Sequence, residues 1–356
     1  MSTLDWAPGN HVFEFHSKDI GNAFHEPLFK RIIGTKAFKR LSNIHFLGGI
    51  DYLVPAQSRS FRRHNRFNHT LAVASLAKRY AEKTCLDRKD SLKLVVAALL
   101  HDIGHAPLSH SLESVFRSLY GVDHHKVGRE IILGINPLGF EIASILDDFD
   151  IDAQELVDLI EGDKVISGAD IFSRAINVDT AEGIIRSSMY MACHVPLSPV
   201  SVIDALARLD ESSSALLDEF WLQKGRVYKS LIQSSAGALA DIICVAYMKE
   251  NLTSFSADQY WDTGLVFKRC HAGLFVDLDG FRRDGVVPDY AMPYVESSRI
   301  SKRTFVIDSA VELREPGDLD LRYRQVRREA KISTSGFRRT GRSWSAVYPV
   351  GEGILE

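Results

Sequence analysis

The chain has 356 residues, of which 45% are hydrophobic and 25% charged, and its formal net charge is −3. These values are ordinary for a globular protein of one large domain or two, and they give no overall attraction to nucleic acid or membranes. The four cysteines show no C-x-x-C spacing, no apolar run approaches the roughly 18 residues of a membrane span, and the first residues lack a signal-peptide pattern. We therefore expect a cytoplasmic protein with buried, reduced thiols and no disulfide framework.

The predicted elements begin with an N-terminal arm, residues 1–26, which has few periodic apolar positions. From residue 27 to about 255 the apolar spacing is helical, and we expect one helical domain there. Its central helix is the nearly all-apolar stretch 92–100, and Ser109 is a candidate cap for the helix that follows. The other expected helices cover 69–82, 109–119, 125–134, 153–161, 168–191, 200–217 and 233–250.

The C-terminal region, residues 256–356, differs in character. Its short segments 265–267, 274–278, 303–307 and 346–348 are β-leaning and separated by Gly, Pro and Asp. Residues 299–342 hold twelve Lys or Arg against six Asp or Glu. This basic segment could contact a polyanion such as nucleic acid, contact another subunit, or form a solvated surface. The expected fold class is mainly α, with a helical core and a smaller mixed α/β C-terminal region.

Histidines are concentrated in one quarter of the chain: eight of the thirteen lie within 45–125. In the stretch 99–113, LLHDIGHAPLSHSLE, an apolar helix runs into the adjacent pair His101 and Asp102. A buried helix end is a costly place for an imidazole and a carboxylate unless a partner compensates them, and a divalent cation does so well. An isolated His-Asp pair is more often a polar helix end. Two more histidines and a glutamate close by favour metal binding here.

Three segments must meet in space to form such a metal site. They contribute His69 from the start of helix 69–82, the pair His101 and Asp102, and Asp179 from helix 168–191. Two nitrogens and two carboxylate oxygens suit Mn²⁺, Fe²⁺, Co²⁺, Ni²⁺ or Mg²⁺ with open water positions better than a closed structural zinc site. Such an ion can activate a water and offset charge on a phosphoryl oxygen.

These motifs resemble the HD-domain phosphohydrolases, in which metal ligands follow the order H…HD…D. The resemblance is closest to the deoxynucleoside triphosphate triphosphohydrolase (dNTPase) branch, which includes bacterial dGTPases. It rests on H-N-R-F-N-H at 64–69, H-D-I-G-H-A-P-L-S-H at 101–110 and N-V-D at 177–179, and it covers about residues 28–190. The resemblance implies that His69, His101, Asp102 and Asp179 hold the metal.

The resemblance also implies roles for the neighbouring side chains. His105 is the expected catalytic histidine, with Glu113 as the acid that orients it, and His110 is expected beside the attacking water or the leaving oxygen. The expected further active-site histidine is His125, with His124 as the alternative. Arg66 and His64 are expected to face the substrate phosphates, and Tyr190 is expected to offer a ring to the substrate.

The chain departs from the dNTPase pattern after Asp179, where Thr180-Ala181-Glu182-Gly183 replaces the usual basic and aromatic side chains, and Asn68 replaces an acid. The leading expectation is a metal-dependent hydrolase of (deoxy)nucleoside triphosphates that releases nucleoside and triphosphate, acts on a nucleotide substrate and forms a homo-oligomer. One alternative is a 5′-nucleotidase or phosphodiesterase acting on another nucleotide. A third hypothesis is a module that binds metal and nucleic acid without turnover.

Overall fold

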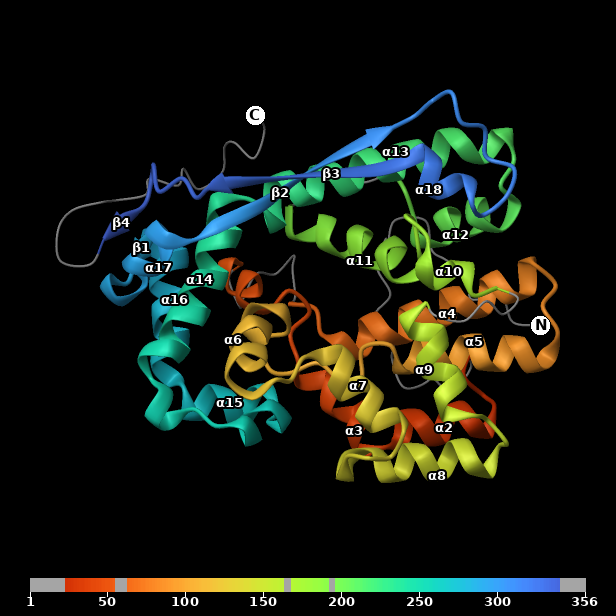
Figure 1. The fold of residues 1–356 in the computed structure, drawn as a ribbon, viewed down its shortest axis with the longest axis horizontal. Coiled ribbons are helices and arrows are strands. Elements are labelled where there is room, and N and C mark those ends of the chain that lie inside the picture. Colours follow the sequence, from red (N-terminus) through yellow and green to blue (C-terminus); the bar gives the residue numbers. More distant parts are fainter. Residues whose placement is uncertain (1–22, 55–62, 163–167, 192–195, 340–356) are drawn as a thin grey trace.

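The computed structural model describes residues 23–54, 63–162, 168–191 and 196–339. Within these ranges the chain is mainly helical, with a small sheet region near its C-terminal end, as the sequence predicted (Figure 1). The expected arm, residues 1–26, falls almost entirely outside the described residues. The first helices are α2 (Pro27–Gly34), α3 (Lys36–Arg40), α4 (Arg66–Lys83), α5 (Arg88–Leu100), α6 (His110–Tyr120), α7 (His124–Ile132), α8 (Phe140–Asp148) and α9 (Ala153–Glu161).

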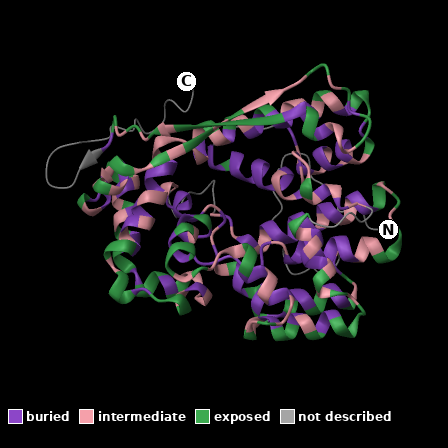
Figure 2. Cartoon of the chain, viewed as in Figure 1, coloured by how far each residue is buried: buried purple, intermediate pink, exposed green. Residues whose placement is uncertain are grey.

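Helix α5 is the centre of the core, as its sequence predicted. Asp87 caps it by accepting a hydrogen bond from the Asp90 amide at 2.8 Å. Every residue from 94 to 100 is buried, and α5 packs along α4 and against α9. Figure 2 shows this buried interior, in contrast with the largely exposed strands β2 and β3 described below. The helix therefore ends inside the protein, which places the polar pair that follows it beside the core.

Two expected long helices are interrupted. Stretch 168–191 forms α10 (Asp170–Ser173) and α11 (Val178–Ser188), because Asn177 starts a new helix with a reciprocal capping box with Thr180. Stretch 200–217 forms α12 (Pro199–Arg208) and the first part of α13 (Glu211–Val227). The break follows from Leu209, whose φ of 47° ends α12, and from Asp210, which caps α13. A π-helical turn, Tyr228–Ile232, follows α13 and leads to α14 (Ser235–Glu250).

The C-terminal region corrects part of the prediction. Segments 265–267 and 274–278 are not strands: they lie in α15 (Gly264–Cys270) and α16 (Ala272–Asp284). The buried positions of α16 are Leu274, Phe275, Leu278 and Phe281, which have helical spacing. Segment 346–348 lies outside the described residues. The remaining elements are α17 (Met292–Ser297), α18 (Asp318–Arg322), β1 (Val286–Val287), β2 (Arg299–Ile307), β3 (Tyr323–Lys331) and β4 (Arg338–Arg339).

Strand β2 includes the predicted segment 303–307, which confirms that part of the expectation. It pairs antiparallel with β3 from Arg299↔Lys331 to Ile307↔Tyr323, and we call this pair the β2–β3 ribbon. The ribbon lies along α13 (Figure 1). The short strands β1 and β4 pair in parallel.

Two further expectations concern thiols and membranes. Cys244 is buried, whereas Cys85 and Cys270 are exposed, so the expectation that the thiols are buried is wrong for these two; Cys193 lies outside the described residues. Among the described helices, none is by itself long and apolar enough to cross a membrane; the segments 211–232 and 235–250, bent by 54°, meet that test only as a pair.

Candidate metal centre and active site

The start of α4, the end of α5 and the start of α11 meet at one point, where four side chains converge. His69 Nε2 lies 3.0 Å from Asp179 Oδ1 and 3.5 Å from Asp102 Oδ2. His101 Nε2 lies 3.6 Å from Asp102 Oδ1 and 3.9 Å from Asp179 Oδ1. The ligand atoms of His69, His101 and Asp179 all lie within 4.8 Å of one another. The structure therefore brings together the four side chains that the sequence singled out as a metal set.

A hydrogen bond at Nδ1 fixes the orientation of each of the two imidazole rings. His101 Nδ1 is 2.8 Å from the carbonyl oxygen of Ala98, so Nδ1 carries the proton that it donates. His69 Nδ1 is 2.5 Å from Glu182 Oε2, which fixes the same tautomer. Both Nε2 atoms are buried, lack a hydrogen bond of good geometry, and point at the two aspartates. Two imidazole lone pairs are thus directed at one point, as metal ligation requires.

The charges around this point favour a cation. Asp102, Asp179 and Glu182 supply three carboxylates, and Arg66 and Arg186 supply two guanidinium groups. Burial opposes charge on His69, but Glu182, Asp179 and Asp102 outweigh it and raise the pKa of His69 to about 9. Burial tends to raise the pKa of Asp179, but its interactions with His69 and His101 outweigh burial and lower the pKa to about 2. These carboxylates, of which Asp102 and Glu182 are buried and Asp179 is half exposed, stabilise a positive charge at His69 Nε2. A proton or a metal ion can supply that charge, and the mixed nitrogen and oxygen donors fit a divalent metal ion.

Arg66 does not face an open substrate space. Its side chain is 5% exposed, and all three of its nitrogens have protein partners. Nη1 donates to Asp102 Oδ2 at 2.6 Å, Nε to Ser109 Oγ at 2.8 Å, and Nη2 to the Phe46 carbonyl at 3.1 Å. The expectation that Arg66 grips phosphate is corrected: the guanidinium holds Asp102 in place, and the charge of Arg66 contributes to a pKa of Asp102 far below its usual range despite burial. Ser109 stands at the N-terminus of α6 without a capping bond, because its hydroxyl bonds Arg66 and His45.

His64 and Tyr190 are also engaged inside the protein. The Tyr190 hydroxyl donates to the buried carboxylate of Asp51 and accepts from the backbone amide of His64 at 3.2 Å. His64 Nδ1 lies 3.1 Å from Arg186 Nη1. Because both side chains are less than a tenth exposed, their expected substrate contacts are corrected to internal contacts behind the metal cluster.

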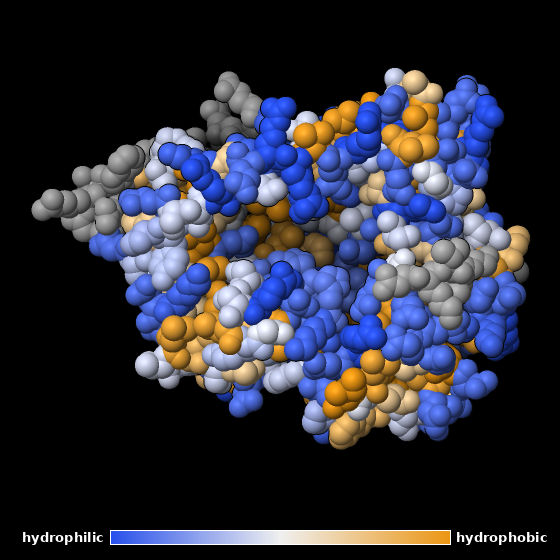
Figure 3. Space-filling model, viewed as in Figure 1, coloured by the Kyte–Doolittle hydropathy of each residue, from blue (hydrophilic) through white to orange (hydrophobic). Residues whose placement is uncertain are grey.

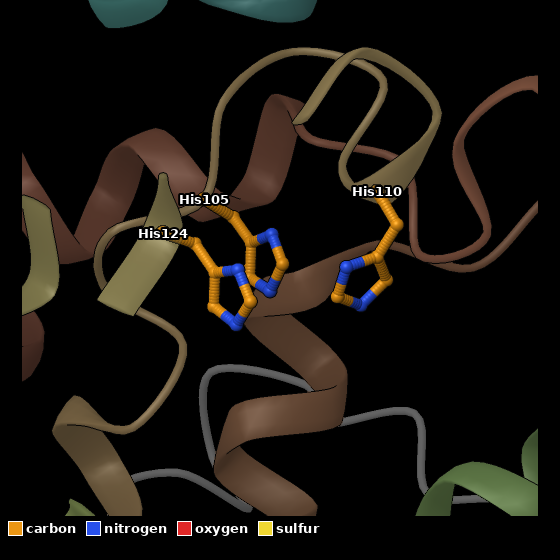
Figure 4. Close-up of side chains that lie close together, drawn as sticks. All are labelled: His105, His110 and His124. Atoms are coloured by element: carbon orange, nitrogen blue, oxygen red, sulfur yellow. The ribbon is translucent and has the colours of Figure 1, made fainter. Parts of the chain in front are cut away.

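A second cluster lies directly beside the metal set and contains His105, His110 and His124 (Figure 4). The His105 and His124 rings stack at 4.2 Å and 10°, and the His110 ring meets His105 edge-on at 4.8 Å. Glu113 joins two of them, with Oε2 2.9 Å from His110 Nδ1 and Oε1 2.9 Å from His124 Nδ1. Although burial opposes it, these two hydrogen bonds hold the pKa of Glu113 well below its usual range.

This arrangement differs from the expected pairing. The acid contacted by His105 Nε2 is Asp102, at 3.2 Å, whereas Glu113 serves His110 and His124. Burial, with the charge of Arg66, lowers the pKa of His105 well below its usual value, so this imidazole is neutral at neutral pH. The histidine that enters the cluster from α7 is His124. His125 is exposed, its ring lies 4.0 Å from the His124 ring at a tilt of 37°, and it lines a small pocket beside His101.

Backbone features explain how α7 approaches the turn that follows α5. A Cβ on Gly104 would lie 2.1 Å from the His124 carbonyl oxygen and 2.4 Å from the Gly128 nitrogen, so only glycine permits the contact. Leu108 and Ser109 both have positive φ, 58° and 46°. Strained residues of this kind persist where the surrounding structure holds them, often at functional sites.

Sequence reasoning missed two contributors, Glu182 and Arg186. We interpreted Glu182 as part of a departure in the substrate pocket, but it is fully buried and binds His69. Arg186 Nη2 contacts Glu182 at 2.5 Å, and both side chains are 0% exposed. The signal was present in the spacing: Asp179, Glu182 and Arg186 are separated by three and four residues, which places them on one face of α11.

Comparisons with known proteins agree with this geometry. Residues 66–184 match the model of the family described as the HD domain. The chain is 32% identical over 261 residues to the uncharacterized protein YwfO of Bacillus subtilis, which covers 70% of this chain and 56% of YwfO. It is 40% identical over 100 residues to the deoxynucleoside triphosphate triphosphohydrolase SAMHD1 of Bos taurus, covering 26% of this chain and 16% of that protein. It is 34% identical over 134 residues to the uncharacterized protein MJ1154 of Methanocaldococcus jannaschii, covering 36% and 27%. The chain thus spans about half the length of YwfO and less than a third of the other two.

Proposed function

Because residues 66–184 form an HD domain, the fold of metal-dependent hydrolases, we propose that the protein hydrolyses (deoxy)nucleoside triphosphates to nucleoside and inorganic triphosphate. The observation that carries the proposal is the position of Asp102 between the two clusters. Its Oδ2 lies 3.5 Å from His69 Nε2 in the metal set, and its Oδ1 lies 3.2 Å from His105 Nε2 in the imidazole cluster. A phosphoryl group at this junction would touch both clusters.

In this proposal His69, His101, Asp102 and Asp179 hold one divalent cation, which when bound would activate water and offset charge on a phosphoryl oxygen. The chain's own contribution is rigidity. Glu182 fixes the ring of His69, at 2.5 Å from Nδ1, and Arg66 fixes the carboxylate of Asp102, at 2.6 Å. These supporting groups keep the four ligand atoms converged on one point.

The imidazole cluster is placed to move a proton. His110 and His124 both direct Nδ1 at Glu113, which leaves Nε2 of each ring for a substrate oxygen. Glu113 is ionised and orients both rings through Nδ1, which places Nε2 of His110 to give a proton to the leaving 5′ oxygen. Burial lowers the pKa of His124 despite its hydrogen bond to Glu113. His105 is neutral and can hold or accept a proton from the attacking water. We assign proton transfer to His105 or His110.

The substrate assignment is supported by the aligned segment of the SAMHD1 relative, whose name gives a deoxynucleoside triphosphate triphosphohydrolase. A second candidate, a 5′-nucleotidase or phosphodiesterase, is favoured by one observation: Arg66, His64 and Tyr190, which the resemblance assigns to the substrate, are bound inside the protein. The homo-oligomer that the resemblance implies belongs to the same proposal, and the mass of the purified protein in solution tests it.

A mass-resolved product assay separates the candidates. The purified protein is incubated with Mn²⁺, Mg²⁺, Co²⁺ or Fe²⁺ and with a panel of dNTPs, NTPs, monophosphates and cyclic nucleotides. Nucleoside together with intact triphosphate is the expected result. Orthophosphate from monophosphates, or an opened cyclic phosphate, would replace the proposal with the second candidate. Asp102→Ala is the inactive control, and Asp204→Asn, which removes a carboxylate that pairs with Arg79 away from the site, is the active control.

A further inference from the structure

The β2–β3 ribbon concentrates positive charge that is mostly without ion-pair partners among the described residues. Its two strands hold seven Lys or Arg and one acid, Glu329. Three cross-strand pairs place like charges directly opposite each other: Arg299↔Lys331, Lys302↔Arg328 and Arg303↔Arg327. Within the described residues, Arg324 is the member of this set that forms an ion pair, with Asp308 at 3.3 Å. Like charges facing each other destabilise a strand pair. An anion bound to these side chains would reduce that repulsion.

The three pairs do not share one face. Because side chains alternate along a strand, Arg303 and Arg327 lie on the same face as Phe305, and Lys302 and Arg328 lie on the opposite face. Phe305 packs edge-on against Trp221 of α13, with ring centroids 5.2 Å apart. The Arg303–Arg327 pair therefore lies on the inner face of the ribbon, toward the body of the protein, and the Lys302–Arg328 pair lies on the outer face.

On the inner face of the ribbon, Arg303 contacts Tyr228, which follows α13. The Arg303 guanidinium lies 4.9 Å over the Tyr228 ring, and its Nη1 donates to the Tyr228 hydroxyl at 3.2 Å. Burial raises the pKa of the Tyr228 hydroxyl, and the charges of Arg303, Asp179 and Arg327 also influence this pKa. Tyr228 begins the π-helical turn after α13, and such turns are frequent at functional sites.

Lys224 stands between the ribbon and the metal set. Its side chain is buried, and its Nζ donates to the carbonyl oxygen of Ala175, just before α11, without an ion-pair partner among the described residues. The charges of Asp179 and Arg303 both act on this ammonium, and burial lowers its pKa to about 8. Figure 3 shows the molecule hollowed near its centre, below the ribbon and α11 and above α6 and α7. Lys224 and Tyr228 thus belong to a segment that packs between α11, which carries Asp179, and strand β2 of the ribbon.

We propose that Arg303 and Arg327 on the inner face of the ribbon, with Lys224 and Tyr228, bind the phosphate chain of the substrate. The proposal rests on the proposed function, and it gives the C-terminal region a role in the same site. It also supplies the phosphate contacts that Arg66 and His64 do not provide, because those side chains are bound internally. A guanidinium pair suits this task, since each group can donate two parallel hydrogen bonds to phosphate oxygens.

The test is a direct binding measurement that requires no turnover. Inorganic triphosphate, with Mg²⁺ matched in both solutions, is titrated into the metal-loaded protein by calorimetry. Arg303→Gln combined with Arg327→Gln is compared with Lys302→Gln combined with Arg328→Gln. The two variants remove the same charge from adjacent positions of the same strands but from opposite faces. We expect the inner-face variant to bind triphosphate at least about tenfold more weakly, as loss of charged hydrogen bonds predicts. The outer-face variant should stay within about twofold of the unchanged protein.

A thermal melt without added anion checks that both variants fold. Removal of an opposed charge pair favours a higher melting temperature in both, whereas loss of the Arg303 contacts with Tyr228 acts against it in the inner-face variant alone. Equal losses in both variants would overturn the proposal, because they would reduce the effect to overall charge. No loss in the inner-face variant, or no triphosphate binding by the unchanged protein, would also overturn it. Binding of a single-stranded oligonucleotide that depends on the inner pair, without triphosphate binding, would assign the ribbon to nucleic acid instead. Failure of the proposed function gives a different result from failure of this proposal. In that case triphosphate would bind and need the inner pair, but the product assay would detect no nucleotide hydrolysis.

Discussion

Replacing Glu182 with glutamine isolates what this buried carboxylate does for the metal centre. The substitution keeps the size and one acceptor oxygen of the side chain but removes its charge. Glu182 accepts from His69 Nδ1 at 2.5 Å and from Arg186 Nε and Nη2 at 2.9 Å and 2.5 Å. One glutamine oxygen cannot serve both partners as the two carboxylate oxygens do. Both the orientation of His69 and the neutralisation of Arg186 are therefore weakened together.

The magnitudes follow from burial. Glu182 and Arg186 are both 0% exposed, and leaving one member of a buried pair uncompensated costs about 3–5 kcal/mol. Because glutamine retains part of the bonding, we expect the free energy of unfolding to fall by about 3 kcal/mol. Loss of the carboxylate behind a ligating histidine typically weakens metal binding by about 10- to 100-fold, or about 1.4–2.8 kcal/mol.

The assay measures both quantities on the same protein. Metal is removed with a chelator, Mn²⁺ or Co²⁺ is titrated back by calorimetry, and urea unfolding is followed without metal. The matched control is Asp204→Asn, which removes a carboxylate that receives two bonds from Arg79, at 2.6 Å and 2.7 Å, outside the metal set. The control should lose stability and keep its metal Kd. A Glu182→Gln protein that is less stable but binds metal with an unchanged Kd would refute the reasoning, since Glu182 would then act only on packing.

Three further predictions test other parts of the site. His101→Ala and Asp102→Ala should abolish both metal content and turnover, whereas His105→Ala should keep the metal and lose rate; an inactive His105→Ala protein without metal would contradict this division of roles. Arg66→Lys should lower metal content and melting temperature because three hydrogen bonds are disturbed; a raised KM with unchanged metal would return Arg66 to substrate binding. Asp51→Asn should remove a pH dependence of stability. Burial raises the pKa of Asp51 from 3.8 to about 7, so the folded state keeps a proton that the unfolded state loses, and stability falls as pH rises from about 4 to about 7, by about 4 kcal/mol. Urea unfolding at pH 5 and pH 8 should show about 3 kcal/mol of this fall, and an equal pH dependence in Asp51→Asn would exclude Asp51 as the source.

The sequence by itself determined the parts that local spacing controls. The apolar run of α5 predicted a buried helix that ends at His101 and Asp102, and the order of His69, His101, Asp102 and Asp179 predicted the set that converges in the structure. The predicted cap Ser109 failed, because its hydroxyl bonds Arg66 and the His45 carbonyl, which lie far from it in the chain. The strand prediction at 303–307 succeeded on local spacing, whereas 274–278 failed because its apolar positions were interpreted with the wrong period.

Only the tertiary structure decided which side chain meets which. Glu182 contacts His69 across 113 residues, and Tyr190 contacts Asp51 across 139. Glu113 could have served His105 or His124, and the close approach of Gly104 to α7 selected His124. The inner and outer faces of the β2–β3 ribbon became distinct only where Phe305 docked on α13. The local spacing of apolar residues determines the period and the buried face of each element. The packing of elements far apart in the chain determines which side chains meet, and a buried charge is stable only when that packing brings a compensating group to it.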